Sequence, residues 1–248
     1  MTDSLGWRKK FGVIAPSTNT SVEPEYAAMQ PRGVTNHFCR AWIPDDPVES
    51  DEDFVKLVEN IRAKTESALD RVMTCDPSYV IMGMSAETFW DGVVRADGLK
   101  KQFEERAGVG VALGSHACQE AIRCYGDIKR ISVITPYMPV GDSQVETFFR
   151  ESGFDVVALK GLKCPSPMRI AHEQPATLRR ALREVDDPSV ELIIQVGTNL
   201  ACARVAAEAE HWLDKPVLAI NTCTYWYALR QNGIQDRMDG FGSLMLEH

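Results

Sequence analysis

The stretch VIAPSTNTSVEPEY, residues 13–26, joins an apolar run to a cluster of small polar side chains. The apolar run begins at Phe11 and stops at Pro16. Four polar residues follow at once: Ser17, Thr18, Asn19 and Thr20. A short, continuous apolar run that ends at a turn signal is typical of a strand buried on both faces of a parallel sheet. The polar cluster then lies at the carboxyl end of the strand, where open parallel sheets bind their ligands.

The same pattern returns in the second half of the chain. Three pairs of segments match in the same order: 14–16 with 134–136, 80–81 with 193–194, and 121–123 with 228–230. The offsets between partners fall slowly, from 120 to 113 to 107 residues. One such match arises easily by chance, but three in order indicate two related halves. The strands again end in polar segments, which read MSAET, TPYMP and VGTNL.

Helix-like segments separate these strands, and three of them are clear in the sequence: 51–75, 175–185 and 201–214. Alternation of strands and helices predicts an α/β fold with parallel sheets. We expect two pseudo-symmetric halves, each a parallel sheet flanked by helices, over residues 1–128 and 129–248. The C-terminal helix near residues 225–232 belongs to the second half in sequence but could pack on the first.

Composition argues against several classes of protein. The 248 residues carry a net charge of −8 and a pI near 5.2, so no basic footprint for nucleic acid is visible. No run of about 18 apolar residues is present, and the N-terminal MTDSLGWRKK lacks an apolar signal core. We expect a cytoplasmic protein that binds neither nucleic acid nor membrane. The seven cysteines form no CxxC pair, which argues against a disulfide framework or a four-cysteine zinc site.

Motifs for cofactors and metals are missing from the sequence. The chain has no GxGxxG and no GxxxxGK[ST] string, so dinucleotide and P-loop sites are not predicted. The segment HEQPATL, which begins at His172, lacks the HExxH spacing of a zinc protease. The sequence motifs therefore give no support to a dinucleotide, a P-loop or a zinc-protease site.

Two like halves that face each other would enclose one pocket between their polar strand ends. Hydroxyl, amide and helix N-terminal N–H groups at such a place suit an anion, and a carboxylate in particular. Ser85 and Thr198 would donate hydrogen bonds to a carboxylate or an enediolate, as an oxyanion site does. Glu87 lies just past a strand end beside Phe89 and Trp90, where apolar neighbours could raise its pKa into the range of a general base. The competing interpretation is that these residues only cap helices.

Two of these loops resemble signatures of the aspartate/glutamate racemase superfamily, in the branch of maleate cis–trans isomerase and arylmalonate decarboxylase. APSTNTSVEPE is similar to the first signature, whose asparagine falls on Asn19. TPYMP is similar to the loop whose tyrosine binds a substrate carboxylate, and that tyrosine falls on Tyr137. The resemblance covers roughly residues 10–235. It implies two pseudo-symmetric α/β halves, a small carboxylate substrate and no metal or organic cofactor, and it makes a homo-oligomer plausible.

Chemistry in this superfamily normally uses cysteine thiols at the ends of equivalent strands. Racemases use two thiols, the isomerase uses one of its two as a nucleophile, and the decarboxylase uses one to protonate an enediolate. The resemblance and the internal repeat both place these positions at Met84 and Gly197. Neither residue is a cysteine, and neither are the residues on each side of them. The fold and the anion pocket therefore carry over from the superfamily better than the mechanism does.

The leading hypothesis is a cofactor-independent enzyme on a small carboxylate or dicarboxylate, an isomerase or carboxy-lyase with an enediolate-like intermediate. The candidate catalytic residues are Tyr137, Ser85, Thr198 and Glu87. The candidate substrate-binding residues are Asn19, Ser17, Thr18, Met84, Gly197, Asn199 and Thr222. Among the cysteines, we expect Cys223 in the segment INTCTYW to lie nearest the pocket.

Two alternatives keep the pocket but change its use. In a hydrolase or hydratase, Glu87 or His116 would act as the base, and the pH–rate profile would show a carboxylate-like or imidazole-like limb. In a non-catalytic carboxylate-binding protein, ligands would stabilise the fold without turnover.

Overall fold

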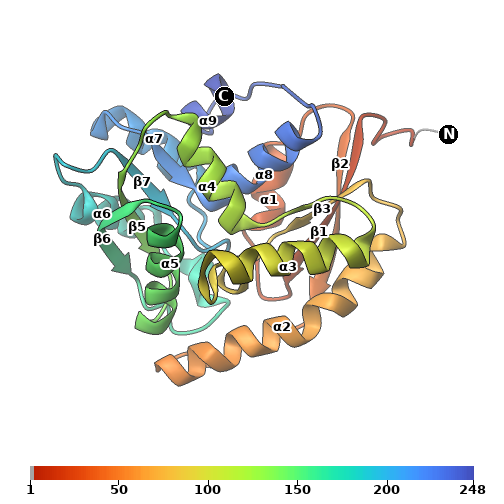
Figure 1. The fold of residues 1–248 in the computed structure, drawn as a ribbon, viewed down its shortest axis with the longest axis horizontal. Helices are drawn as coiled ribbons and strands as arrows, with labels where there is room; N and C mark the ends of the chain where they lie inside the picture. The colour runs from red at the N-terminus through yellow and green to blue at the C-terminus, as the bar shows by residue number, and fades with distance from the viewer. Residues whose placement is uncertain (1–2) are drawn as a thin grey trace.

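The computed structural model describes residues 3–248, which form two parallel four-stranded sheets flanked by helices (Figure 1). The first sheet has the strand order β2-β1-β3-β4. Its strands are β1 (Lys9–Pro16), β2 (Val34–Ala41), β3 (Tyr79–Met82) and β4 (Val111–Ala112). The helices around it are α1 (Val22–Ala28), α2 (Asp51–Met73), α3 (Gly92–Ala107) and α4 (Gly114–Cys124), with a 3₁₀ turn, η1, at Ala86–Phe89.

The second sheet repeats this topology, with the strand order β6-β5-β7-β8. Its strands are β5 (Arg130–Thr135), β6 (Asp155–Gly161), β7 (Leu192–Gln195) and β8 (Val217–Ala219). Its helices are α5 (Pro139–Glu151), α6 (Pro175–Val185), α7 (Ala203–Leu213), α8 (Ile220–Gln231) and α9 (Ser243–Glu247), with a second 3₁₀ turn, η2, at Arg169–His172. The predicted fold class, two similar α/β halves with parallel sheets, is therefore confirmed.

The two halves match residue by residue in their central strand pairs. In the first sheet Gly12 pairs with Val80, and in the second Ser132 pairs with Ile193. These pairs are related by the offsets of 120 and 113 residues that the sequence repeat gives. Since the registers match, the loop after β3 and the loop after β7 occupy equivalent places in the two halves.

Helices on both faces bury the central strands. All residues of β3 and β7 are buried, as a parallel sheet covered on both sides requires. The long helix α2 begins after Ser50, whose hydroxyl accepts a hydrogen bond from Asp53 N at 3.2 Å. Its buried face includes Phe54, Val58 and Ile61, and the helix packs on β1 and β2. The cap thus sets where α2 starts and which side chains it turns toward the sheet.

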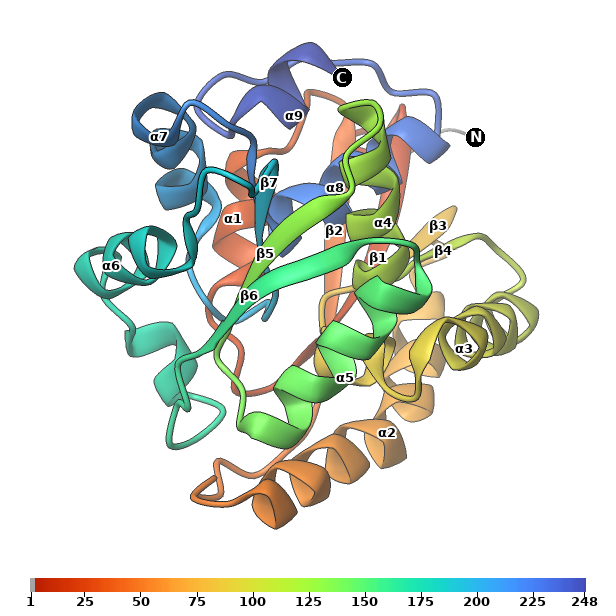
Figure 2. The ribbon, with the colours of Figure 1, turned by 60° about the vertical axis from the view of Figure 1, so that its left-hand side comes forward.

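The halves meet along α4 and α8, which pack against each other near the middle of the molecule (Figures 1 and 2). α8 also contacts α1, β3 and β4. A helix that follows the last strand of the second sheet therefore lies against the first sheet and its helices. The division of the chain at residues 128 and 129 stays a prediction.

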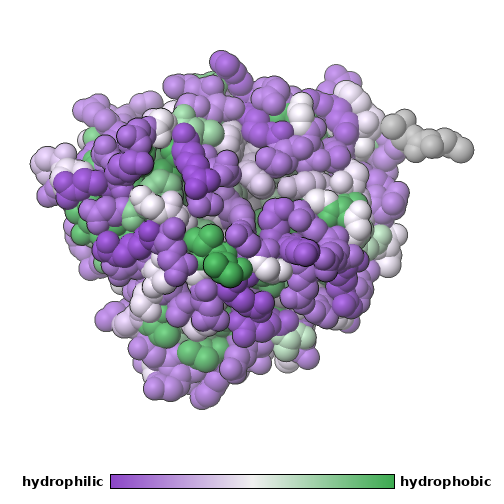
Figure 3. Space-filling view, viewed as in Figure 1, coloured by the Kyte–Doolittle hydropathy of each residue, from purple (hydrophilic) through white to green (hydrophobic). Residues whose placement is uncertain are grey.

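The face of the molecule in Figure 3 is mostly hydrophilic, with apolar side chains scattered over it. Over residues 3–248 no helix combines the length and the apolar character that crossing a bilayer needs. The large exposed apolar side chains are Leu5, Trp7, Trp42, Val94, Trp212 and Leu246. Scattered side chains of this kind are ordinary on a protein surface.

Candidate active site

A cavity that is partly open to solvent lies at the carboxyl ends of β1, β3, β5 and β7. Four loops from the two halves line it, one after each of these strands. Eight of the predicted site residues are in the lining: Thr18, Asn19, Met84, Ser85, Tyr137, Gly197, Thr198 and Asn199. The fold therefore brings together side chains from four distant parts of the sequence, at the sheet edges where parallel folds bind ligands.

A pair of hydroxyl groups joins the two halves at this cavity. Ser85 Oγ and Tyr137 Oη are 2.6 Å apart, and Thr198 N donates a hydrogen bond to Ser85 Oγ at 3.1 Å. Because one hydroxyl of the pair donates to the other, one proton of the two is left over for a third group. Both side chains line the cavity, so that proton can be donated to a bound anion.

The Tyr137 phenol is set up as a hydrogen-bond donor. Burial raises its pKa well above the ordinary value, although the hydrogen bond with Ser85 opposes the shift. The phenol is therefore protonated at neutral pH. Its ring packs on Phe54 with the centroids 5.0 Å apart, and Tyr137 N donates to Thr135 Oγ1 at 3.0 Å. These contacts fix the direction in which the hydroxyl points.

Two asparagines tie the loop after β1 to the loop after β7. Asn19 Nδ2 donates to Thr198 Oγ1 at 3.2 Å, while its Oδ1 accepts from two N–H groups at the start of α1, both at 3.0 Å. Asn199 Oδ1 accepts from Thr20 N at 2.9 Å. Asn19 thus satisfies the N-terminus of a helix and lines the cavity at the same time. The capping and binding interpretations of the sequence are compatible here.

Much of the remaining lining is apolar, and the sequence does not predict it. It includes Ile43 after β2, Phe54, Leu57 and Ile61 on α2, and Ile170 in η2. Helical spacing predicts an apolar face on α2, but not that part of this face borders a cavity. No Lys, Arg, His, Asp or Glu side chain of residues 3–248 is in the lining. An anion bound there would be held by neutral donors.

Glu87 does not line the cavity, which corrects its prediction as a general base. The residue is 4% exposed, and its Oε1 accepts a hydrogen bond from Arg62 Nε of α2 at 2.9 Å. Arg95 Nη2 of α3 lies 3.9 Å from the same oxygen. The expected apolar setting is wrong because these two arginines, remote in sequence, supply counter-charges.

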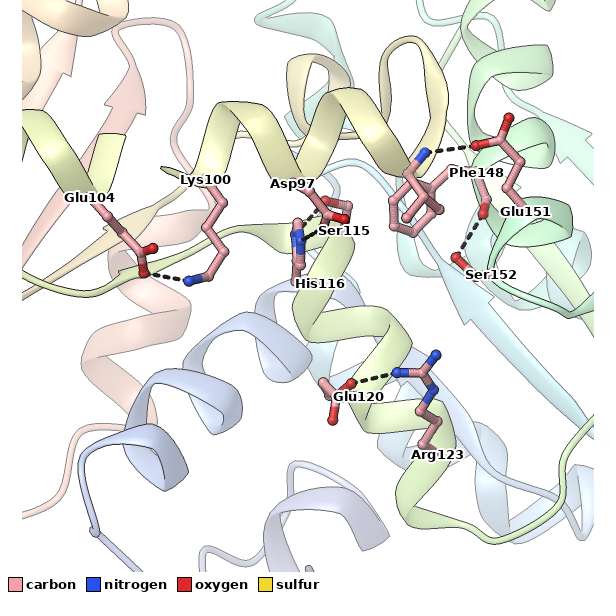
Figure 4. Close-up of polar contacts among 11 residues, drawn as sticks. Asp97, Lys100, Glu104, Ser115, His116, Glu120, Arg123, Phe148, Glu151 and Ser152 are labelled. Carbon is pink, nitrogen blue, oxygen red and sulfur yellow. Dashed lines mark hydrogen bonds and ion pairs between the residues drawn. The ribbon is translucent and has the colours of Figure 1, made fainter. Parts of the chain in front are cut away.

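His116 also lies outside the cavity lining. Figure 4 shows it between α3 and α4, where its Nε2 is 2.8 Å from Asp97 Oδ1. Its Nδ1 is 3.4 Å from Ser115 Oγ, so both ring nitrogens have protein partners. The hydrolase and hydratase alternative therefore finds neither of its two predicted bases at the cavity.

Three further predicted residues are placed elsewhere. Thr222 and Cys223 are buried within α8, and Cys223 contacts the Cys118 thiol of α4. Ser17 Oγ accepts from Ile43 N at 3.0 Å and lies within 3.2 Å of Ile43 O, which braces the loop rather than facing the cavity. All seven cysteines lie within the described residues, and none of them lines the cavity.

Comparison with known proteins identifies the family. A family model described as arylmalonate decarboxylase matches residues 11–245, nearly the whole chain. The chain belongs to the arylmalonate decarboxylase family. Membership confirms the predicted resemblance to this branch of the aspartate/glutamate racemase superfamily and the predicted enzyme class, an isomerase or carboxy-lyase.

Individual relatives agree with this assignment. Maleate isomerase of Pseudomonas putida is 25% identical over 255 residues, which cover 95% of this chain and 96% of the relative. A mutant of Nocardia farcinica maleate cis–trans isomerase with a covalently bound succinylcysteine intermediate has a TM-score of 0.87 at 19% identity and covers 97% of this chain and 99% of its own. A liganded mutant of arylmalonate decarboxylase has a TM-score of 0.80 at 18% identity, covering 97% and 100%. The solved structures share the fold of this family member along nearly its whole length.

The two positions at which we expect thiols of the family differ from each other in this chain. Gly197 has a φ of +116°, and a Cβ atom there would lie 2.4 Å from Cδ of Pro136. The position therefore takes glycine unless the loop rearranges. Met84 is buried, and Thr65 Oγ1 donates to its Sδ at 3.6 Å. In this family member a side chain at the second position, cysteine included, would strain the loop.

Proposed function

We propose that the chain is a cofactor-independent enzyme that acts on a small carboxylate or dicarboxylate through an enediolate-like intermediate. The observation that carries the proposal is the Ser85–Tyr137 pair, supported by Thr198 N, at a cavity between the halves. Such neutral donors stabilise the negative charge that grows on carboxylate oxygens when an enediolate forms. The relatives, maleate isomerase and arylmalonate decarboxylase by name, point to the same class of substrate.

Decarboxylation with a tyrosine as proton donor fits this cavity better than an isomerisation or decarboxylation that depends on a thiol. The Nocardia farcinica relative carries a succinylcysteine intermediate, whereas none of the cysteines in residues 3–248 lines the cavity here. In the proposed step the bond between the α-carbon and one carboxyl group breaks, carbon dioxide leaves, and the electron pair enters the remaining carboxylate as an enediolate. The Tyr137 hydroxyl then gives its proton to the α-carbon, and water restores the phenol.

A non-catalytic carboxylate-binding protein is the second candidate. It is favoured by one observation, the lack of any charged or imidazole side chain in the cavity lining over residues 3–248. Such a protein would gain thermal stability from its ligand but would leave that ligand unchanged.

One experiment separates these possibilities. The purified protein is incubated in deuterated water with maleate, substituted malonates, aspartate, glutamate and hydroxy-acids, and NMR follows each acid. Loss of carbon dioxide from a malonate, with deuterium entering at the α-carbon, supports the proposal. The same reaction should survive alkylation of the thiols, because the mechanism uses none. Turnover that alkylation abolishes contradicts it, and stabilisation without any turnover favours the binding protein.

A further inference from the structure

Glu25 on α1 lies beside the loop after β7 and outside the cavity lining. Its Oε1 accepts a hydrogen bond from Ala203 N, at the start of α7, at 3.0 Å. Its Oε2 accepts from Asn221 Nδ2 at 2.6 Å, and the same nitrogen donates to Thr198 O at 2.9 Å. The carboxylate thus holds one end of the loop directly and the other end through Asn221.

The loop between these two attachments, residues 197–202, presents Thr198 and Asn199 to the cavity. Its position also sets the 3.1 Å hydrogen bond from Thr198 N to Ser85 Oγ. Ser21 Oγ donates to Asn199 O at 2.8 Å, so a residue beside Glu25 holds the middle of the loop. A misplacement of about 1 Å in such groups lowers reaction rates by large factors. The contacts that fix this loop therefore also fix the geometry of the cavity.

We propose that Glu25 is a positioning residue for the cavity: its carboxylate fixes both ends of loop 197–202 and so places Thr198 and Asn199. Its consequence for catalysis rests on the proposed function, whereas its effect on the loop can be measured without any substrate. Glu25 acts through the two N–H groups that donate to it, since it does not border the cavity itself.

The charge state of Glu25 is poised near neutral pH. Burial raises its pKa to about 7, although its two hydrogen bonds and the charge of Arg204 favour the carboxylate. Tyr26 and Cys202 are the other titratable groups that interact with it, and burial raises the pKa of both, so they are neutral. With the folded-state pKa above the ordinary value of 4.5, the free energy of unfolding falls as pH rises from about 4.5 to 7. Ionisation of Glu25 therefore lowers the free energy of unfolding over this pH range.

Protonation changes how Glu25 can bond to Asn221. A carboxylate accepts at both oxygens, whereas a carboxylic acid carries a hydroxyl group that must donate. Asn221 Oδ1 is a buried acceptor with no partner among the described residues. If the amide turns to accept this proton, its Nδ2 leaves Thr198 O. Lowering the pH through about 7 therefore releases the loop at its Thr198 end.

Hydrogen exchange of individual amides, followed by NMR between pH 6 and 8, tests the proposal. The probes are the amides of Thr198, Leu200 and Ala203, with protection factors corrected for the intrinsic pH dependence. In the wild type we expect the protection of Thr198 and Leu200 to fall about tenfold as pH drops through 7, the size expected when one hydrogen bond is lost. The protection of Ala203 should also fall, because the oxygen that accepts from its N–H loses its charge. Glu25→Gln should give the low protection at every pH, because its amide nitrogen cannot accept.

Two further variants make the test specific. Glu210→Gln is the matched control, since Glu210 on α7 likewise accepts from two backbone N–H groups, those of Val217 and Ser243, away from the cavity. It should keep the wild-type pH step at all three probes. Asn221→Ala should abolish the step at Thr198 and Leu200 but keep it at Ala203, and it serves as the test if Glu25→Gln does not fold.

The experiments distinguish a failure of the role of Glu25 from a failure of the proposed enzyme activity. A pH step that persists in Glu25→Gln, or that disappears equally in Glu210→Gln, overturns the role of Glu25. A protein that turns over none of the acids but shows the step refutes the proposed enzyme while leaving Glu25 as the residue that holds the loop. In an active protein, Glu25→Gln should lower kcat on a substituted malonate about tenfold.

Discussion

The loop after β3 and the loop after β7 occupy equivalent places in the two halves but make different hydrogen bonds. In the loop after β3, Ser85 forms a hydrogen bond with Tyr137 of the second half. In the loop after β7, Thr198 accepts a hydrogen bond from Asn19 of the first half. The loops also meet directly, since Thr198 N donates to Ser85 Oγ and Thr198 Oγ1 donates to Gly83 O at 3.3 Å.

This difference shows what a duplicated fold fixes and what it leaves free. The shared strand register places both loops at the same sheet edge, so the location of the cavity follows from the repeat. The side chains then differ: the β3 loop supplies a hydroxyl group, while the β7 loop supplies a backbone N–H and two side chains. Because each loop bonds to the opposite half, the cavity exists only when the halves are docked.

Loss of the cross-half hydroxyl pair should have the largest effect. Tyr137→Phe removes one hydroxyl group of this pair and with it the proposed proton donor, and should lower kcat on a decarboxylated malonate by about 10²–10³-fold, as loss of a general acid does. Steady-state kinetics measure the change. Tyr125→Phe is the matched control, because Tyr125 Oη and Ser243 Oγ form a similar pair, 2.7 Å apart, outside the cavity. Equal losses in both variants would contradict a role for the cavity pair.

Substitutions at the equivalent positions Gly197 and Met84 compare how much each loop contributes to the free energy of unfolding. Gly197→Ala puts a Cβ atom against Pro136 at a positive φ, and should lower the free energy of unfolding by about 2–4 kcal/mol. Met84→Leu keeps the volume of a buried side chain and should cost less than about 1.5 kcal/mol. Urea unfolding of both variants gives the two values. Similar losses would mean that the two loops are equally strained.

Much of the architecture could be predicted because it depends on local pattern. The apolar runs that end in polar residues fix the strands, and the carboxyl-end rule places Asn19, Ser85 and Tyr137 at one cavity. Glu25 stands in the stretch VIAPSTNTSVEPEY, but its partners Ala203 and Asn221 are 178 and 196 residues away. No local spacing reveals contacts of that kind.

The wrong prediction for Glu87 has the same physical origin. Its neighbours in sequence, Phe89 and Trp90, are apolar, whereas its neighbours in space are Arg62 and Arg95. The position of a carboxylate relative to a strand end can be predicted from the sequence. The side of the turn on which it emerges depends on how α2 and α3 pack, which the sequence does not show.

Glu87→Gln is a smaller and more specific test of the β3 loop. Removing one partner of a buried charge pair destabilises, but Arg62 is 42% exposed, so solvent screens the loss to about 1–2 kcal/mol. Turnover should stay within about threefold of wild type, since the residue does not line the cavity. Glu208→Gln, in the exposed pair with Arg179, should change stability by less than about 0.5 kcal/mol. A large loss of turnover in Glu87→Gln would restore it as a base.

The smallest effects should come from another equivalent pair, Ser115 and Thr222, at the starts of α4 and α8. Thr222 Oγ1 is buried with no partner among the described residues, so Thr222→Val removes an unsatisfied hydroxyl at constant shape. The free energy of unfolding should stay the same or rise by up to about 1 kcal/mol. Ser115 Oγ lies 3.4 Å from His116 Nδ1. Ser115→Ala should therefore lower the free energy of unfolding by about 0.5 kcal/mol. Thermal unfolding of both variants measures the sign of each change. A loss in Thr222→Val would mean that a buried water satisfies this hydroxyl, and the two helix starts would then be alike in chemistry as well as in position.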